Sequence, residues 1–269
     1  MSETFVNAPL IELVVEVQWD LPQEVAEPED AVGPSLQTME RYASPFYQRM
    51  SHAMSRLGYS QSERLVPTGY SPAPGSPIYR YTDPAEDAET VVYQVGDGSF
   101  SVNAFPPYKT WAEFLPAVQD GLTALLEVLA AEAEPVEFQQ VSLNYVDAFD
   151  ERFWGSTSRY EFLTKTLGFA ITMPIGTIDH LNERDPKGAF IQFSGTTRDG
   201  DTLLLKAGLA VVVNEPHVVM DTSISHREAV AGKLEALVSV LERSHTVIHD
   251  SFVAITLPVA NILRGEEDA

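Results

Sequence analysis

The sequence predicts an α+β fold in which two β-α-β-β-β-α units form a curved, mainly antiparallel sheet with helices packed on one face. Two observations support this prediction. Stretches in which apolar and polar residues alternate, as in half-buried strands, are followed by stretches with apolar residues at helical spacing. The same order of elements occurs in residues 1–134 and again in 135–269, with a boundary near Pro135. Because antiparallel strands with one apolar face need helices to cover it, we expect both units to share one sheet within a single compact domain.

The strongest local signal is a hairpin closed by Asp97-Gly98. This dipeptide favours a type I′ turn, which needs φ > 0 at both central residues. The turn sets the register and places three cross-strand pairs on one apolar face: Val95 with Phe100, Tyr93 with Val102, and Val91 with Ala104. A long amphipathic helix follows to Leu129, with Thr110 as its N-cap and Glu113 completing a capping box. Pro116 lies inside this helix and should kink it or delay its regular start.

The remaining elements are predicted from the same two periodicities. In the first half they are a strand at Leu10–Trp19, a helix at Ser35–Leu57 and a strand at Ile78–Thr82. In the second half the strands are Val136–Phe149, Ala189–Gly195, Thr202–Val213, His217–Ile224 and Ser251–Leu257, and the helices are Tyr160–Leu167 and Arg227–Ile248. This order of elements resembles TATA-binding-protein-like and helix-grip folds, a likeness of architecture that implies no function.

Composition and charge narrow the classes of function. The chain of 269 residues has 39 acidic and 17 basic side chains, a formal charge of −22 and no cysteine. It therefore has no disulfides, no thiolate metal ligands and no cysteine nucleophile. Direct binding to nucleic acid is disfavoured because it needs clustered positive charge. A strongly negative net charge keeps a protein soluble or attracts a basic partner. We expect a cytoplasmic protein, since the sequence shows neither a basic secretory signal nor an apolar run that approaches a membrane span.

Strand alternation also predicts a polar sheet face on the side away from the helices. Its residues carry amide, hydroxyl and carboxylate groups and are Glu12, Glu16, Gln94, Ser101, Asn103, Gln140, Ser142, Asn144, Gln192 and Ser194. One interpretation is a face that is simply washed by solvent. The other is a concave surface that binds a polar ligand, or a loop or helix of a partner protein.

No constellation of residues predicts a catalytic or metal site. Glu12 and Glu16 lie on one strand, which places them ~13 Å apart at about 3.3 Å per residue, too far for a shared-proton pair. His245 and His249 are four residues apart, as in zinc-binding helices, but no third ligand stands at a known spacing. Histidine is also favoured near a helix C-terminus for another reason, because its positive charge interacts favourably with the helix dipole. We therefore expect no catalytic residue, no metal and no cofactor.

Four segments resemble a family of uncharacterised proteins that occur sporadically in bacteria and archaea. They are Phe5–Trp19, Val95–Trp111, Ser142–Asp150 and Ile248–Thr256, of which the first is the most specific. The resemblance covers nearly the whole chain, and it assigns no catalytic residues to this sequence. A sporadic distribution is typical of mobile elements, toxin–antitoxin pairs and phage-defence islands, so the resemblance implies a context of that kind.

These observations favour a non-enzymatic, acidic interaction subunit, for example the antitoxin, immunity or accessory component of a defence or toxin–antitoxin system. Its expected partner is another protein of basic charge, with a homodimer as a further option and neither nucleic acid nor membrane involved. The alternative is a small-ligand sensor of helix-grip type. An enzyme that uses the carboxylates or the two histidines is a third option.

Overall fold

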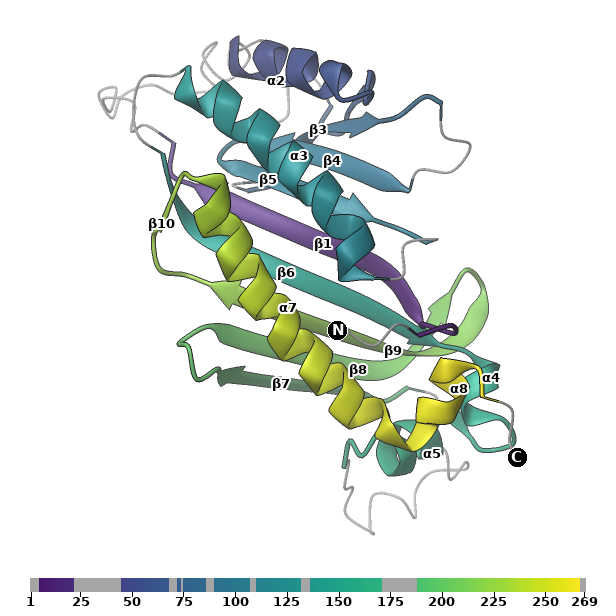
Figure 1. Ribbon diagram of the computed structural model, residues 1–269. Helices are drawn as coiled ribbons and strands as arrows, with labels where there is room; N and C mark the ends of the chain where they lie inside the picture. The colour runs from purple at the N-terminus through teal and green to yellow at the C-terminus, as the bar shows by residue number, and fades with distance from the viewer. Residues whose placement is uncertain are drawn as a thin grey trace, which may run out of the picture. The chain divides into compact units, whose positions relative to one another are not determined.

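The fold is α+β, as predicted, with antiparallel strand pairing. The computed structural model describes residues 5–21, 45–67, 72–73, 75–85, 90–106, 110–131, 136–170 and 188–266. Within them ten strands hydrogen-bond in the order β2-β3-β4-β5-β1-β6-β9-β8-β7, and β10 pairs with β6 (Figure 1). The strands are β1 (Leu10–Trp19), β2 (Gln61–Arg64), β3 (Pro77–Thr82), β4 (Val91–Gly96), β5 (Ser99–Ala104), β6 (Glu137–Phe149), β7 (Phe190–Thr196), β8 (Thr202–Val212), β9 (Glu215–His226) and β10 (Val230–Ala231).

Two long helices and several short ones complete the described elements. They are α2 (Pro45–Arg56), α3 (Trp111–Ala130), α4 (Glu151–Trp154), α5 (Arg159–Glu161), the π-helical η1 (Phe162–Thr166), α7 (Leu234–Thr256), the 3-10 helix η2 (Leu257–Val259) and α8 (Ala260–Arg264). The first part of the expected helix Ser35–Leu57 and the predicted boundary near Pro135 lie outside the described residues. The division into halves 1–134 and 135–269 stays a prediction.

The predicted final strand Ser251–Leu257 is wrong, because α7 continues to Thr256. Phe252, Val253 and Ile255 are residue types that favour strands. In the structure they lie on α7, where they pack against buried aromatic residues such as Phe149. Tertiary packing therefore overrides strand propensity here. The same helix starts later than expected, since Val230 and Ala231 pair with Phe138 and Glu137 of β6 instead. The short strands β2 and β10 and helix α4 were not predicted, because none of them shows a sustained apolar pattern.

The chain forms two compact units that alternate along the sequence. Unit 1 comprises residues 1–13, 143–225 and 243–269, and unit 2 comprises residues 14–142 and 226–242. Strands β1 and β6 and helix α7 each contribute residues to both units.

The core of unit 2 confirms the predicted hairpin and helix. Strands β4 and β5 pair in the expected register, with Val95 opposite Phe100 and Tyr93 opposite Val102. Helix α3 begins at Trp111, and the Thr110 hydroxyl accepts a hydrogen bond from the Glu113 N–H, as the cap predicts. The helix continues through Pro116. Helix α2 is joined to the hairpin turn by a hydrogen bond of 2.6 Å from Tyr47 Oη to Asp97 Oδ1.

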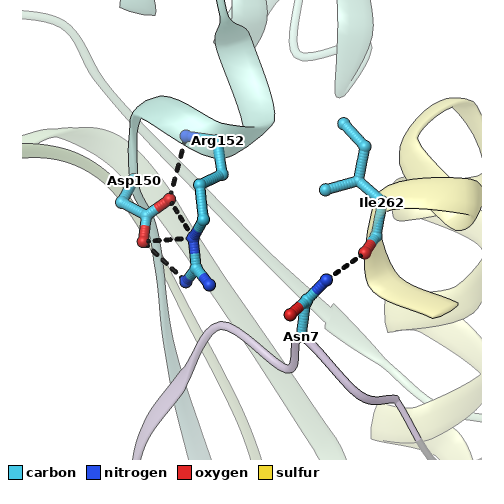
Figure 2. A network of polar contacts seen from close by, with 4 residues as sticks. All are labelled: Asn7, Asp150, Arg152 and Ile262. Atoms are coloured by element: carbon cyan, nitrogen blue, oxygen red, sulfur yellow. Dashed lines mark hydrogen bonds and ion pairs between the residues drawn. The ribbon is translucent and has the colours of Figure 1, made fainter. Parts of the chain in front are cut away.

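The core of unit 1 is an aromatic cluster that ties both chain ends to β6. Phe149 contacts Phe153 and Phe162 in edge-on or tilted geometry and stacks on Phe252. Near this cluster Asn7 Nδ2 donates to the Ile262 carbonyl at 2.8 Å, which fastens the N-terminal segment to α8 (Figure 2). Asp150 caps α4 and pairs with Arg152, and that hydrogen-bonded guanidinium holds the pKa of the Asp150 carboxyl below its ordinary value.

One helical stretch of the described residues, Leu234–Arg264, is long and apolar enough to cross a membrane by length and composition; its most apolar 18 residues have a mean hydropathy of 1.5, and 22% of them are buried. The sequence pattern did not reveal it, because the expected helix stopped at Ile248. Its exposed positions include Glu235, Glu242, Arg243 and Asp250. Each of these charges would cost several kcal/mol near the centre of a bilayer. In α7, Leu237, Val240, Leu241 and Ile248 are buried.

Candidate functional site

Several residues of the predicted polar face that belong to unit 2 are cross-strand partners or hydrogen-bond with one another. Gln94 and Ser101 are direct cross-strand partners. The buried Asn103 amide donates to Ser101 Oγ at 3.0 Å and to the Val92 carbonyl at 3.3 Å. Glu16 accepts a hydrogen bond of 2.6 Å from Gln18, and its carbonyl accepts one from Ser142 at 3.5 Å. Gln140 is half-buried on β6. Many of the polar groups on this face therefore form their hydrogen bonds within the protein.

Two charged residues extend this polar face across further strands. They were not predicted from the sequence. Glu63 lies opposite Arg80, and Arg80 lies opposite Gln94, so one row runs across β2, β3, β4 and β5. Arg80 Nη1 is 3.8 Å from Glu63 Oε2, and the buried Arg80 Nε has no hydrogen-bond partner in the described part of the chain. Strand β2 has no apolar alternation, so no sequence signal placed Glu63 in a sheet.

In unit 1, an ion pair that was also not predicted lies next to the predicted polar residue Gln192. Lys206 lies opposite both Asp221 and Gln192, and its Nζ is 3.0 Å from Asp221 Oδ2. Burial, and secondarily the charge of Asp221, raises the pKa of the Glu12 carboxyl. Asn144 Oδ1 is buried and has no hydrogen-bond partner among the described residues. Gln192 and Ser194 are exposed on β7.

Strand β7 is the most unusual surface of unit 1. It ends the strand order, and Phe190 and Phe193 are 66% and 56% exposed. Ala189 accepts a hydrogen bond from the Leu209 N–H, and Thr197 donates one to Asp201. Because hydrogen-bonded pairs alternate in an antiparallel ladder, the odd-numbered residues between them bond to β8. The N–H and C=O groups of the even-numbered residues 190, 192, 194 and 196 therefore point away from β8.

In the part of the chain that the structure describes, this edge carries none of the features that normally protect a strand from pairing with another chain. Natural edges are protected by charges, prolines, bulges or short length. The seven residues FIQFSGT contain no charge and no proline, and their pairing with β8 runs without a register shift. At the opposite end of the strand order, β2 is four residues long and carries Glu63 and Arg64. Among the described residues, β7 is thus an unprotected edge, whereas β2 is a protected one.

A second apolar feature of unit 1 is the turn between β8 and β9. Val211 and Val213 are 69% and 89% exposed. Val213 and Asn214 have φ values of 48° and 67°. Asparagine tolerates this left-handed conformation, but a β-branched residue there is strained. The two-residue loop that joins β8 and β9 needs positive φ at both of its positions, which accounts for this conformation.

The two histidines lie beside a buried tyrosine of unit 1. Tyr145 Oη and His245 Nδ1 share a hydrogen bond of 2.8 Å, and the rings of His245 and His249 are 5.7 Å apart. Burial lowers the pKa of His245 to about 4. On the same strand as Tyr145, burial raises the pKa of Asp147 to about 8. In the described part of the chain, no group of three His, Cys, Asp or Glu side chains could hold a metal ion.

Replacing His245 with glutamine should make the protein less sensitive to mild acid. Between pH 6.5 and about 4 the unfolded histidine binds a proton that the native, buried imidazole does not. The native state therefore loses stability as pH falls through this range. Glutamine does not titrate and keeps a group that can bond with Tyr145. Urea unfolding at intervals of half a pH unit should show a shallower loss of stability in the variant; equal slopes in both proteins would contradict the assignment.

No family model matches the chain, and no curated protein matches it in sequence. The resemblance to a sporadically distributed family, and the defence context that it implies, stay predictions.

Proposed function

We propose that this chain is a non-enzymatic protein-interaction subunit whose partner adds a β-strand to the edge of β7. The observation that carries the proposal is the unprotected edge itself, seven uncharged residues with two exposed phenylalanines. In β-strand addition, main-chain hydrogen bonds supply affinity and alternate side chains supply specificity. The outward N–H and C=O groups of residues 190, 192, 194 and 196 are the groups that would bond to the partner.

The two faces of β7 define the side chains that an added strand should carry. Phe193 lies on the face of β8 that bears the buried Leu205, so a partner residue beside it would be apolar. Gln192 and Ser194 lie on the other face, where a polar partner residue would fit, and Phe190 lies on that face at the start of the strand. The incoming strand should therefore alternate between apolar and polar residues.

The charge of the chain adds a second property of the partner. A formal charge of −22 raises the association rate of a basic protein and opposes contact with an acidic one. A second copy of this chain carries the same charge. We therefore favour a basic partner over self-association through β7.

Ser194→Pro and Ser194→Ala form a matched pair for testing this function. The Ser194 N–H points away from β8, so proline there removes a donor needed by an added strand without breaking the β7–β8 ladder. Alanine keeps that donor. The stoichiometric partner would first be isolated from the source cells with the tagged chain and identified by mass spectrometry. Its affinity for the purified variants would then be measured by calorimetry.

We expect the proline variant to weaken binding on the order of 100-fold, and the alanine variant to bind within a factor of about three of the natural chain. Thermal unfolding of both variants serves as the control for folding. A partner that binds the proline variant with unchanged affinity would exclude β7 as the site. Recovery of the chain without any stoichiometric protein would count against the interaction function itself.

A further inference from the structure

Helices α2 and α3 of unit 2 enclose a small groove between them. Its volume is about 230 Å³. Helix α3 contributes Asp120, Thr123, Ala124 and Glu127, which are spaced i, i+3, i+4 and i+7 and so share one face of the helix. Ala53, Arg56 and Leu57 line the opposite side. Figure 1 shows α2 and α3 side by side.

The size of the groove limits what it could bind. Pockets for cofactors and drug-sized ligands occupy roughly 300–1,000 Å³, so about 230 Å³ is too little for such a molecule. It is suitable for one long side chain. The alanines at positions 53 and 124 are almost completely buried, and Leu57 is an exposed apolar residue of the lining. These three residues offer an apolar wall for an aliphatic stem.

The polar groups of the groove favour a cation. Arg56 Nη2 and Glu127 Oε2 are 2.8 Å apart and neutralise each other. Asp120 forms no ion pair within the described part of the chain, so its carboxylate gives the groove a net negative charge. The Thr123 hydroxyl donates to the Gln119 carbonyl at 2.7 Å, which leaves its lone pairs able to accept a hydrogen bond. Asp120 and Thr123 thus present two acceptors one helical turn apart.

We propose that this groove binds an arginine side chain of the partner protein, with the stem against Ala53, Leu57 and Ala124 and the guanidinium on Asp120 and Thr123. Arginine suits the site better than lysine, because its planar fork reaches two acceptors at once and is more weakly hydrated. That the arginine belongs to a partner protein rests on the proposed function. The site itself does not depend on it, since the groove lies in unit 2 and β7 lies in unit 1.

The test uses N-acetyl-arginine amide as the probe and the full chain as the receptor. Two-dimensional ¹⁵N–¹H NMR spectra would follow the titration at low ionic strength. We expect a Kd on the order of 1–10 mM for so small a ligand, with shifts concentrated in residues 53–57 and 120–127. N-acetyl-citrulline amide has nearly the same shape without the charge and should bind at least about 10-fold more weakly, since the ionised hydrogen bond to Asp120 is lost.

Asp120→Asn and Glu137→Gln form the matched variants for this test. Each removes one carboxylate of unit 2, and Glu137 is exposed on β6, outside the groove lining. We expect Asp120→Asn to weaken the probe at least about five-fold, because it removes the charged acceptor, and Glu137→Gln to leave the Kd within a factor of about two. Equal weakening by both variants, equal binding of citrulline, or shifts spread over the acidic surface would overturn the site.

Calorimetry with the isolated partner separates this inference from the proposed function. If the groove receives an arginine of that partner, Asp120→Asn should weaken its affinity about 10-fold without affecting the contribution of β7. If the probe binds as expected but the partner's affinity is unchanged, the groove binds arginine and the assignment to the partner is wrong. The Ser194→Pro result is independent of both outcomes.

Discussion

Replacing Asp147 with asparagine should raise the free energy of unfolding at pH 7 by about 4 kcal/mol and leave it unchanged near pH 3. Burial raises the pKa of the native Asp147 carboxyl from 3.8 to about 8. Above pH 4 the unfolded chain therefore loses a proton that the native state keeps. Stability falls by about 1.4 kcal/mol for each pH unit until the native group also ionises, near pH 8. Asparagine has a similar shape and abolishes this loss.

The measurement is urea unfolding of both proteins from pH 3 to pH 9. The two stabilities should coincide near pH 3 and separate steadily above pH 4, with a plateau above pH 8. Asp199→Asn is the control, because it makes the same change of charge at an exposed position in the turn between β7 and β8. Parallel pH profiles for the Asp147 variant and the natural chain would show that the native carboxyl is ionised at neutral pH.

Gly121→Ala should destabilise unit 2 by about 1–3 kcal/mol, although alanine is the better helix former by about 1 kcal/mol. A Cβ atom at position 121 of α3 would lie 2.4 Å from Tyr93 Cε1 and 2.9 Å from Cδ1. The tyrosine cannot easily move aside. Its hydroxyl donates to the Ala117 carbonyl at 2.9 Å, and its ring packs edge-on against Tyr59 at a centroid distance of 4.5 Å. The steric cost should therefore exceed the gain in helix propensity.

A double-mutant cycle would confirm that the clash with Tyr93 is the cause. In a Tyr93→Leu background the aromatic ring is absent, so the added methyl group should cost less or become favourable. Guanidinium unfolding of the four proteins gives the coupling free energy. An increase in the stability of the single Gly121→Ala variant would contradict the close contact between α3 and β4.

The elements that were predicted correctly depend on short-range chemistry. The hairpin register follows from Asp97-Gly98 and strict alternation, and the start of α3 follows from Thr110 and Glu113. These signals extend over no more than about ten residues. They can therefore be interpreted correctly without knowledge of the rest of the chain. The segment Ser251–Thr256 shows the limit of that approach. Its residues suit a strand by propensity, but they continue a helix because that path buries them against Phe149.

The candidate surfaces also include some features that the sequence predicted and others that only the tertiary structure shows. Alternation alone was enough to derive which side chains of a strand are polar, and the cross-strand pairs of Gln94 with Ser101 and Lys206 with Gln192 agree with it. The exposure of Phe190 and Phe193, the Lys206–Asp221 ion pair and the groove beside Asp120 could not be derived in this way. Whether a strand lies at an edge, and which helices meet, depends on pairing between residues far apart in the sequence. Local periodicity contains no information about that pairing, so only the assembled sheet and helices reveal where a partner could bind.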